Sequence, residues 1–151
     1  MQRRLVIVVS AVLVVAAAGV VVAQAAGRSG GHGSAPRQFV GYWMGIDPLD
    51  GGDSRRAITP NEGRTFSLIG RDTVFTLCDD TDRAIVTVDD LTVRGSALVS
   101  DDFVISCTNT NSTVRLKVRY EPIDRNIVRE TVTSQTGEPV DEIIFHRVSA
   151  P

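Results

Sequence analysis

Alternation of apolar and polar residues at every second position is the feature that most constrains this chain. In residues 114–120, Val114, Leu116, Val118 and Tyr120 occupy one face, and basic residues occupy the other. A period of two is typical of a β-strand with one buried face, whereas an amphipathic helix repeats every 3.6 residues. No stretch from Gln38 onward keeps the helical period, so this part of the chain is predicted to be all-β.

Further strand candidates are rich in Val, Ile, Thr and Phe and are separated by turn residues at intervals of roughly 8–12 residues. They cover residues 39–46, 55–59, 65–69, 73–78, 84–88, 91–93, 102–108, 114–120, 127–133 and 142–148. Short hairpin connections join them, and residues 121–126 are predicted to be one of the turns. The pattern predicts a small antiparallel up-and-down barrel of about eight strands, which has no open edges. A β-sandwich is the alternative.

The N-terminus carries an export signal. Arg3 and Arg4 precede residues 5–23, nineteen residues without a charge, which are predicted to form an apolar helix. Positive charges before an apolar run hold the N-terminus in the cytoplasm and direct the rest of the chain across the membrane. Ala25 closes a small-residue motif at which a signal peptidase would cut. The segment is therefore either a cleaved signal peptide or a retained transmembrane anchor, because its length fits both.

The chain is thus predicted to have three regions. Residues 1–26 form the signal peptide or signal anchor, residues 27–37 a Gly/Ser-rich flexible linker, and residues 38–151 the β-barrel domain. The domain is expected outside the cytoplasm. It would be secreted or periplasmic after cleavage, and otherwise anchored in the cytoplasmic membrane through residues 5–23.

Cys78 and Cys107 are the only cysteines. Each ends a predicted strand, and both lie after the export signal, where disulfides persist. Redox, nucleophilic and metal-binding roles are disfavoured because no CxxC motif or neighbouring His accompanies them. The pair is therefore expected to be disulfide-bonded.

The sequence Phe39-Val40-Gly41-Tyr42-Trp43 begins the predicted domain. A Gly-x-Trp motif at the first strand of an exported antiparallel meander resembles the lipocalins and their calycin-like relatives. The resemblance implies that Trp43 plugs one end of an eight-stranded barrel and that a late Arg stacks over its indole, for which Arg147 is the candidate. A guanidinium lies favourably on an aromatic face.

Few residues are candidates for chemistry. Asp47, Asp50 and Asp53 form an acidic, Gly-containing loop that would suit Ca²⁺, although the EF-hand spacing is absent and a solvated loop is the simpler interpretation. His146 is the only His in the predicted domain. A hydrolase would need a nucleophile beside it, and no Gly-x-Ser-x-Gly motif exists. No catalytic residue, metal or cofactor is therefore expected.

Charge excludes one class of partner. Sixteen basic and eighteen acidic residues give a net charge of −2, whereas nucleic-acid binding needs clustered Lys and Arg. The sequence favours a non-enzymatic exported barrel that binds a small ligand or an envelope partner. One alternative is a protein inhibitor or interaction module that presents the Asp47–Asp53 loop. The other is a small barrel enzyme that uses His146 with buried carboxylates.

Overall fold

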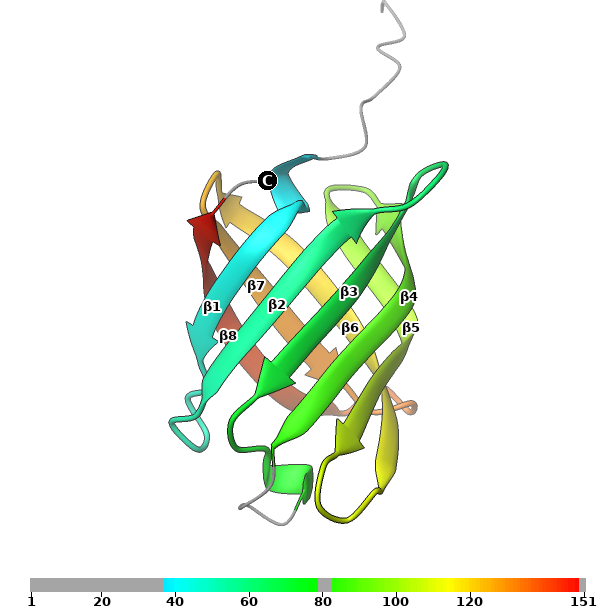
Figure 1. The fold of residues 1–151 in the computed structure, drawn as a ribbon. Helices are drawn as coiled ribbons and strands as arrows, with labels where there is room; N and C mark the ends of the chain where they lie inside the picture. The colour runs from blue at the N-terminus through cyan, green and yellow to red at the C-terminus, as the bar shows by residue number, and fades with distance from the viewer. Residues whose placement is uncertain (1–36, 79–82, 150–151) are drawn as a thin grey trace, which may run out of the picture. The chain divides into compact units, whose positions relative to one another are not determined.

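The computed structural model describes residues 37–78 and 83–149, so the apolar segment, Ala25, nearly all of the linker and the predicted turn at 79–82 lie outside the described residues. Eight antiparallel strands form a closed barrel in sequence order, with β8 paired to β1 (Figure 1). The strands are β1 (Gly41–Ile46), β2 (Asp53–Pro60), β3 (Thr65–Asp72), β4 (Ala84–Arg94), β5 (Ala97–Cys107), β6 (Thr113–Asp124), β7 (Ile127–Thr133) and β8 (Pro139–Ser149). The closed topology confirms the barrel and excludes the sandwich.

The predicted alternation decides which residues form the core. In β6, Leu116, Val118 and Tyr120 are buried, while Arg115 and Arg119 on the other face are exposed. Every strand contributes its inward positions to a single apolar cluster. Burial of this cluster against water is the main force that favours the closed barrel.

A β-bulge explains why the sequence divided β4 into two short strands. The register between β3 and β4 shifts between Phe66 and Leu68, and the Asp89-Asp90 pair between Val88 and Leu91 is exposed. A bulge places two residues of one strand opposite one of its partner, which breaks the period of two without ending the strand. The β5–β6 ladder shifts in the same way beside Asp101-Asp102. The predicted gap at 89–90 was therefore wrong.

Other boundaries also differ from the prediction. β6 continues to Asp124, so only residues 125–126 connect it to β7, and the predicted turn at residues 121–126 was too long. A proline near the end of a strand, here Pro122, is tolerated where the ladder is irregular, and the β6–β7 register shifts at this point. Phe39 lies in the 3-10 helix η1 (Arg37–Phe39) and not in β1, which begins at Gly41.

Gly41 marks the transition from η1 to β1. Its φ of 134° lies in a region that side-chain-bearing residues rarely adopt. The glycine of the Gly-x-Trp motif is thus required by the backbone conformation that turns the chain from η1 into the barrel wall.

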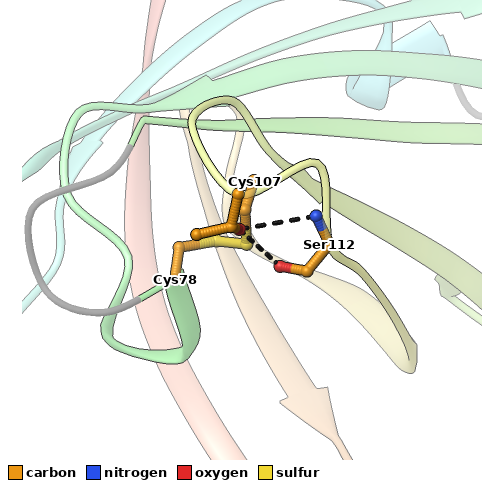
Figure 2. Close-up of a disulfide and its surroundings, with 4 residues drawn as sticks. Cys78, Cys107 and Ser112 are labelled. Carbon is orange, nitrogen blue, oxygen red and sulfur yellow. Dashed lines mark hydrogen bonds between the residues drawn. A yellow bond between two sulfur atoms is a disulfide. The ribbon is translucent and has the colours of Figure 1, made fainter.

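The predicted strand at 73–78 was wrong. Residues 73–83 form the longest connection between consecutive strands, and Thr76–Cys78 within it is the 3-10 helix η2. Cys78 therefore ends η2, while Cys107 ends β5. The two are joined by a disulfide with a Cα–Cα distance of 5.5 Å, which ties this connection to the barrel wall (Figure 2). The amide of Cys107 also donates to the carbonyl oxygen of Ser112 across the β5–β6 connection.

Loss of this disulfide is expected to lower the free energy of unfolding. The double variant Cys78→Ser/Cys107→Ser should lose about 2–4 kcal/mol, because the bond closes a 29-residue span of the unfolded chain. Urea unfolding followed by circular dichroism measures the change. Wild-type protein treated with a reductant should match the double variant. Equal stability of the oxidised and reduced wild type would contradict the prediction.

Candidate functional site

The barrel encloses an ionic cluster, consisting of Arg56, Asp72, Tyr120 and Glu130. Arg56 lies on β2 between Ser54 and Ile58, at an inward position of the alternating strand. The other members lie on three further strands, Asp72 on β3, Tyr120 on β6 and Glu130 on β7. All four are at most 3 % exposed.

The Arg56 guanidinium uses all of its hydrogen-bond donors inside the protein. Nε and Nη2 donate to the two carboxylate oxygens of Glu130, at 2.8 and 2.9 Å. Nη1 and Nη2 donate to the carboxylate of Asp72, at 2.6 and 3.3 Å, and Nη1 also donates to the carbonyl oxygen of Arg55. A guanidinium has five N–H bonds, so none remains for another acceptor. Arg56 is therefore fully satisfied by its own chain.

The charge on Arg56 is stabilised by its surroundings. Burial disfavours the cation, but the carboxylates of Glu130 and Asp72 outweigh this, and the pKa of Arg56 lies well above its usual value. The guanidinium carbon also lies 5.1 Å from the centre of the Phe145 ring, which favours a cation.

Tyr120 stays neutral in this environment. Its hydroxyl donates to Glu130 Oε2, and burial together with the negative charge of Glu130 raises the pKa of the phenol well above its usual value. The hydroxyl thus completes the hydrogen bonding of the Glu130 oxygen that also accepts from Arg56 Nε.

Gly70 provides the space for the Arg56 side chain. It is paired with Arg56 across β2 and β3, and a Cβ at Gly70 would lie 2.7 Å from Arg56 Cδ and 2.6 Å from the Arg55 carbonyl oxygen. A glycine here is therefore required by the close approach of the buried side chain.

The cluster carries one positive and two negative charges. Two further carboxyl groups, of Asp47 and Asp141, lie towards the end of the barrel at which Cys78 and Cys107 are found. Asp47, in the β1–β2 connection, is 4 % exposed and shares a hydrogen bond with Asp141 of β8. Burial raises the pKa of Asp141 to about 7, and the nearby carboxylates of Asp47, Glu130 and Asp72 add to this effect. The pKa of Asp47 is also raised, first by burial. Asp141 is thus protonated in the folded protein below about pH 7.

Asp141 makes stability fall as pH rises. Its folded pKa of about 7 lies above the ordinary 3.8, so between these values the folded state keeps a proton that the unfolded state has lost. Asp141→Asn, whose amide can donate to Asp47 as the protonated acid does, is expected to stabilise the protein at pH 8 by about 1–2 kcal/mol, a shift reduced for partial exposure. The gain should disappear below about pH 4.

Unfolding titrations at several pH values measure this difference. Glu138→Gln, an exposed acid in the β7–β8 connection, is the matched control and should leave the pH profile unchanged. An Asp141→Asn protein with the same pH profile as the wild type would show that Asp141 titrates normally.

The opposite end of the barrel is closed by Trp43 and Arg147. Trp43 is 1 % exposed, its Nε1 donates to the carbonyl oxygen of Phe39 at 2.8 Å, and the Arg147 guanidinium carbon lies 4.1 Å from its ring centre. Arg147 also donates to the carbonyl oxygens of Gln38, Val40 and Arg125. These bonds attach η1 and the β6–β7 turn to the barrel wall.

The remaining predicted site residues do not converge. Asp47 Oδ1 accepts from the Leu49 amide and Asp50 Oδ1 from the Gly52 amide, whereas Asp53 lies 4.0 Å from Arg55. Asp47 and Asp50 thus cap turns, whereas Asp53 pairs with Arg55. Within the described residues, no group of three or more His, Cys, Asp or Glu is placed to hold a metal ion.

His146 lies on the outer face of β8. Its neighbours Phe145 and Arg147 point inward, and the side chain of His146 is exposed to solvent. It therefore does not meet the carboxylates of Asp72 and Glu130, which lie inside the barrel.

Sequence reasoning missed the ionic cluster, although a signal for part of it exists. Glu130 lies between Val128 and Val132, so it shares the inward face of its strand, and Arg56 stands in the same way between Ser54 and Ile58. A charged residue at an inward position predicts a buried partner of opposite charge. Which strand supplies that partner depends on closure of the barrel, which the sequence does not specify.

Known proteins offer no guide to this site: no family model, no curated protein sequence and no solved structure matches the chain.

Proposed function

We propose that this protein is an exported, membrane-tethered and non-enzymatic interaction module, whose barrel is a rigid support and whose binding surface lies on the outside. The satisfied guanidinium of Arg56 is the observation that carries the proposal. A barrel that binds an anionic or polar ligand inside needs a free buried donor. Here the five N–H bonds of Arg56 are all occupied by Glu130, Asp72 and the Arg55 carbonyl.

Packing of the interior supports the same conclusion. Large side chains from around the barrel fill its inward positions and are less than 2 % exposed. They include Trp43, Tyr120, Phe66, Phe103, Phe145, Leu91 and Leu98. Ligand pockets usually combine concave space with a few convergent polar groups that are free to bind. Side chains that already occupy the interior favour recognition through outer faces and connections.

The connections at the disulfide end of the barrel, where Cys78 and Cys107 lie, are suited to recognition. The β1–β2 connection at residues 47–52 is fixed by the Asp47 and Asp50 turns, and residues 73–78 are tied to β5 through Cys78. A loop held in one conformation loses less entropy on binding.

The proposed location and tether rest on two further observations. The disulfide favours an oxidising, extracytoplasmic location. Among the described residues, no helix has the length and apolar character to cross a membrane. The proposed tether is the apolar segment at residues 5–23, which carries no charge and follows Arg3 and Arg4.

A relationship to the lipocalin and calycin group is part of the proposal. It is supported by the eight-stranded up-and-down barrel and by Arg147 on the face of Trp43. In this proposal the chain uses the architecture of that group and replaces the ligand cup with a packed ionic core.

Native mass spectrometry tests the proposal. The full chain would be extracted from its own membrane in mild detergent. We expect the mass of the oxidised polypeptide, with or without a bound protein, and no stoichiometric small molecule. A small molecule that is retained by the wild type and by an Arg55→Met control, but is lost from Arg56→Met, would contradict an outside-binding module.

A further inference from the structure

One rim of the barrel combines exposed basic and apolar side chains. We define the tether-end rim as Arg37, Tyr42, Ile123, Arg125 and Val148, at the end of the barrel where the chain enters through η1. Tyr42 and Val148 are each 59 % exposed and Ile123 is 51 % exposed. Isolated exposed apolar residues are common, but three beside two arginines form an amphipathic surface.

The fold holds these residues beside one another. Tyr42 is the second residue of β1 and is paired with Ser149, the neighbour of Val148 in β8. The Arg147 amide donates to the Asn126 carbonyl oxygen, and its guanidinium donates to the carbonyl oxygens of Gln38 and Arg125. Arg147 therefore fixes η1 and the β6–β7 turn to the same edge of the barrel.

The two arginines of the rim are not neutralised by the barrel. Arg37 and Arg125 are exposed, and neither forms an ion pair with another described residue, whereas Arg94, Arg115, Arg119 and Arg129 all do. At this end, η1 and the connections contain Arg37, Arg64 and Arg125 against a single acid, Glu62, and Asp124 ends β6. At the other end, the sequence of the connections contains six acids and one base, Arg83. The acids are Asp47, Asp50, Asp79, Asp80, Asp82 and Glu138. The two ends of the barrel thus differ in the sign of their charge.

In the sequence, the apolar segment precedes the end of the barrel at which this rim lies. Only thirteen residues, 24–36, separate the apolar segment at residues 5–23 from Arg37. A retained anchor would therefore keep the tether end nearer to the membrane than the disulfide end.

We propose that the tether-end rim docks on an anionic phospholipid surface. Arginine side chains bind lipid phosphates, and the apolar side chains of Tyr42, Ile123 and Val148 enter the headgroup boundary. This inference rests on the tether of the proposed function and adds the surface on which the barrel lies. Docking in this way directs the acidic disulfide end, with its fixed connections, away from the membrane.

Hydrogen–deuterium exchange of the full chain in lipid nanodiscs tests the docking. One set of discs contains phosphatidylcholine alone, and the other contains phosphatidylcholine mixed with phosphatidylglycerol. We expect slower exchange in residues 37–42, 120–126 and 146–149 in the anionic discs, and unchanged exchange in residues 108–112. Equal exchange of the rim in both lipids, or protection of residues 108–112 in its place, would overturn the proposal.

Paired substitutions separate rim contacts from a general charge effect. Arg37→Gln/Arg125→Gln should lower the docking equilibrium about 25-fold, because each arginine near an anionic surface contributes about fivefold. Arg71→Gln/Arg83→Gln removes the same charge from exposed positions at the disulfide end and should retain protection. Equal loss in both double variants would overturn the proposal. Native mass spectrometry tests the outside-binding module independently of both of these outcomes.

Discussion

Replacement of Arg56 by Met is expected to destabilise the barrel by about 3–5 kcal/mol, the cost of leaving buried carboxylates without their partner. Asp72 and Glu130 would lose their shared cation, and Tyr120 alone would remain to donate to Glu130. A loss of this size is a large part of the stability of a small domain. Urea unfolding of the full chain in mild detergent, followed by circular dichroism, measures it.

Arg55→Met is the matched control, because it removes the same type of side chain from the preceding residue of β2. The Arg55 side chain is 52 % exposed and has only a 4.0 Å contact with Asp53, so its loss should cost less than about 1 kcal/mol. The triple variant Arg56→Met/Asp72→Asn/Glu130→Gln should recover much of the lost stability, since it removes the uncompensated charge. Equal effects of the Arg55 and Arg56 substitutions would show that the cluster is not buried.

Trp43→Ala is expected to cost about 3–5 kcal/mol, the usual range for truncation of a large aromatic residue in a core. The substitution removes the ring under Arg147 and the hydrogen bond to the Phe39 carbonyl oxygen. η1 would lose its attachment to β1, and the end of the barrel would open to water. Circular dichroism is the suitable readout, because the variant has no other Trp to report by fluorescence.

Tyr42→Ala controls for loss of an aromatic residue from the same strand. Its side chain points outward, so it should cost less than about 1 kcal/mol, as surface substitutions usually do. A second test uses the wild type, in which iodide should barely quench Trp43. Strong quenching, or equal costs at positions 42 and 43, would contradict closure of this end by the indole.

The sequence predicted the barrel because alternation is a local property that each strand carries by itself. β7 was predicted with the boundaries that the structure has, and the inward residues of β6 were identified correctly. Boundaries failed where tertiary structure overrides the local pattern. β4 continues through the bulge at Asp89-Asp90, although the bulge shifts the alternation of buried and exposed residues by one position. Thr76–Cys78 forms η2 although its residues favour strands.

The ionic cluster could not be predicted from the sequence, for a different reason. Arg56 and Glu130 are 74 residues apart, and their contact exists only because the barrel closes and brings β2 and β7 within reach of each other across its interior. The Asp47–Asp141 pair depends on closure in the same way, since β1 and β8 meet at the seam. By contrast, the cysteine pair could be predicted because it has only one possible pairing.

Exchange of the Arg56 Nε–H proton, observed by NMR, tests the packed ionic core most directly. This proton donates to Glu130 in the middle of the barrel, whereas the guanidinium of Arg55 is open to solvent. After transfer into heavy water, the Arg56 Nε–H signal is predicted to persist for hours while that of Arg55 disappears at once. Exchange of Arg56 as fast as that of Arg55 would mean that water reaches the cluster, and would contradict a barrel filled by its own charged core.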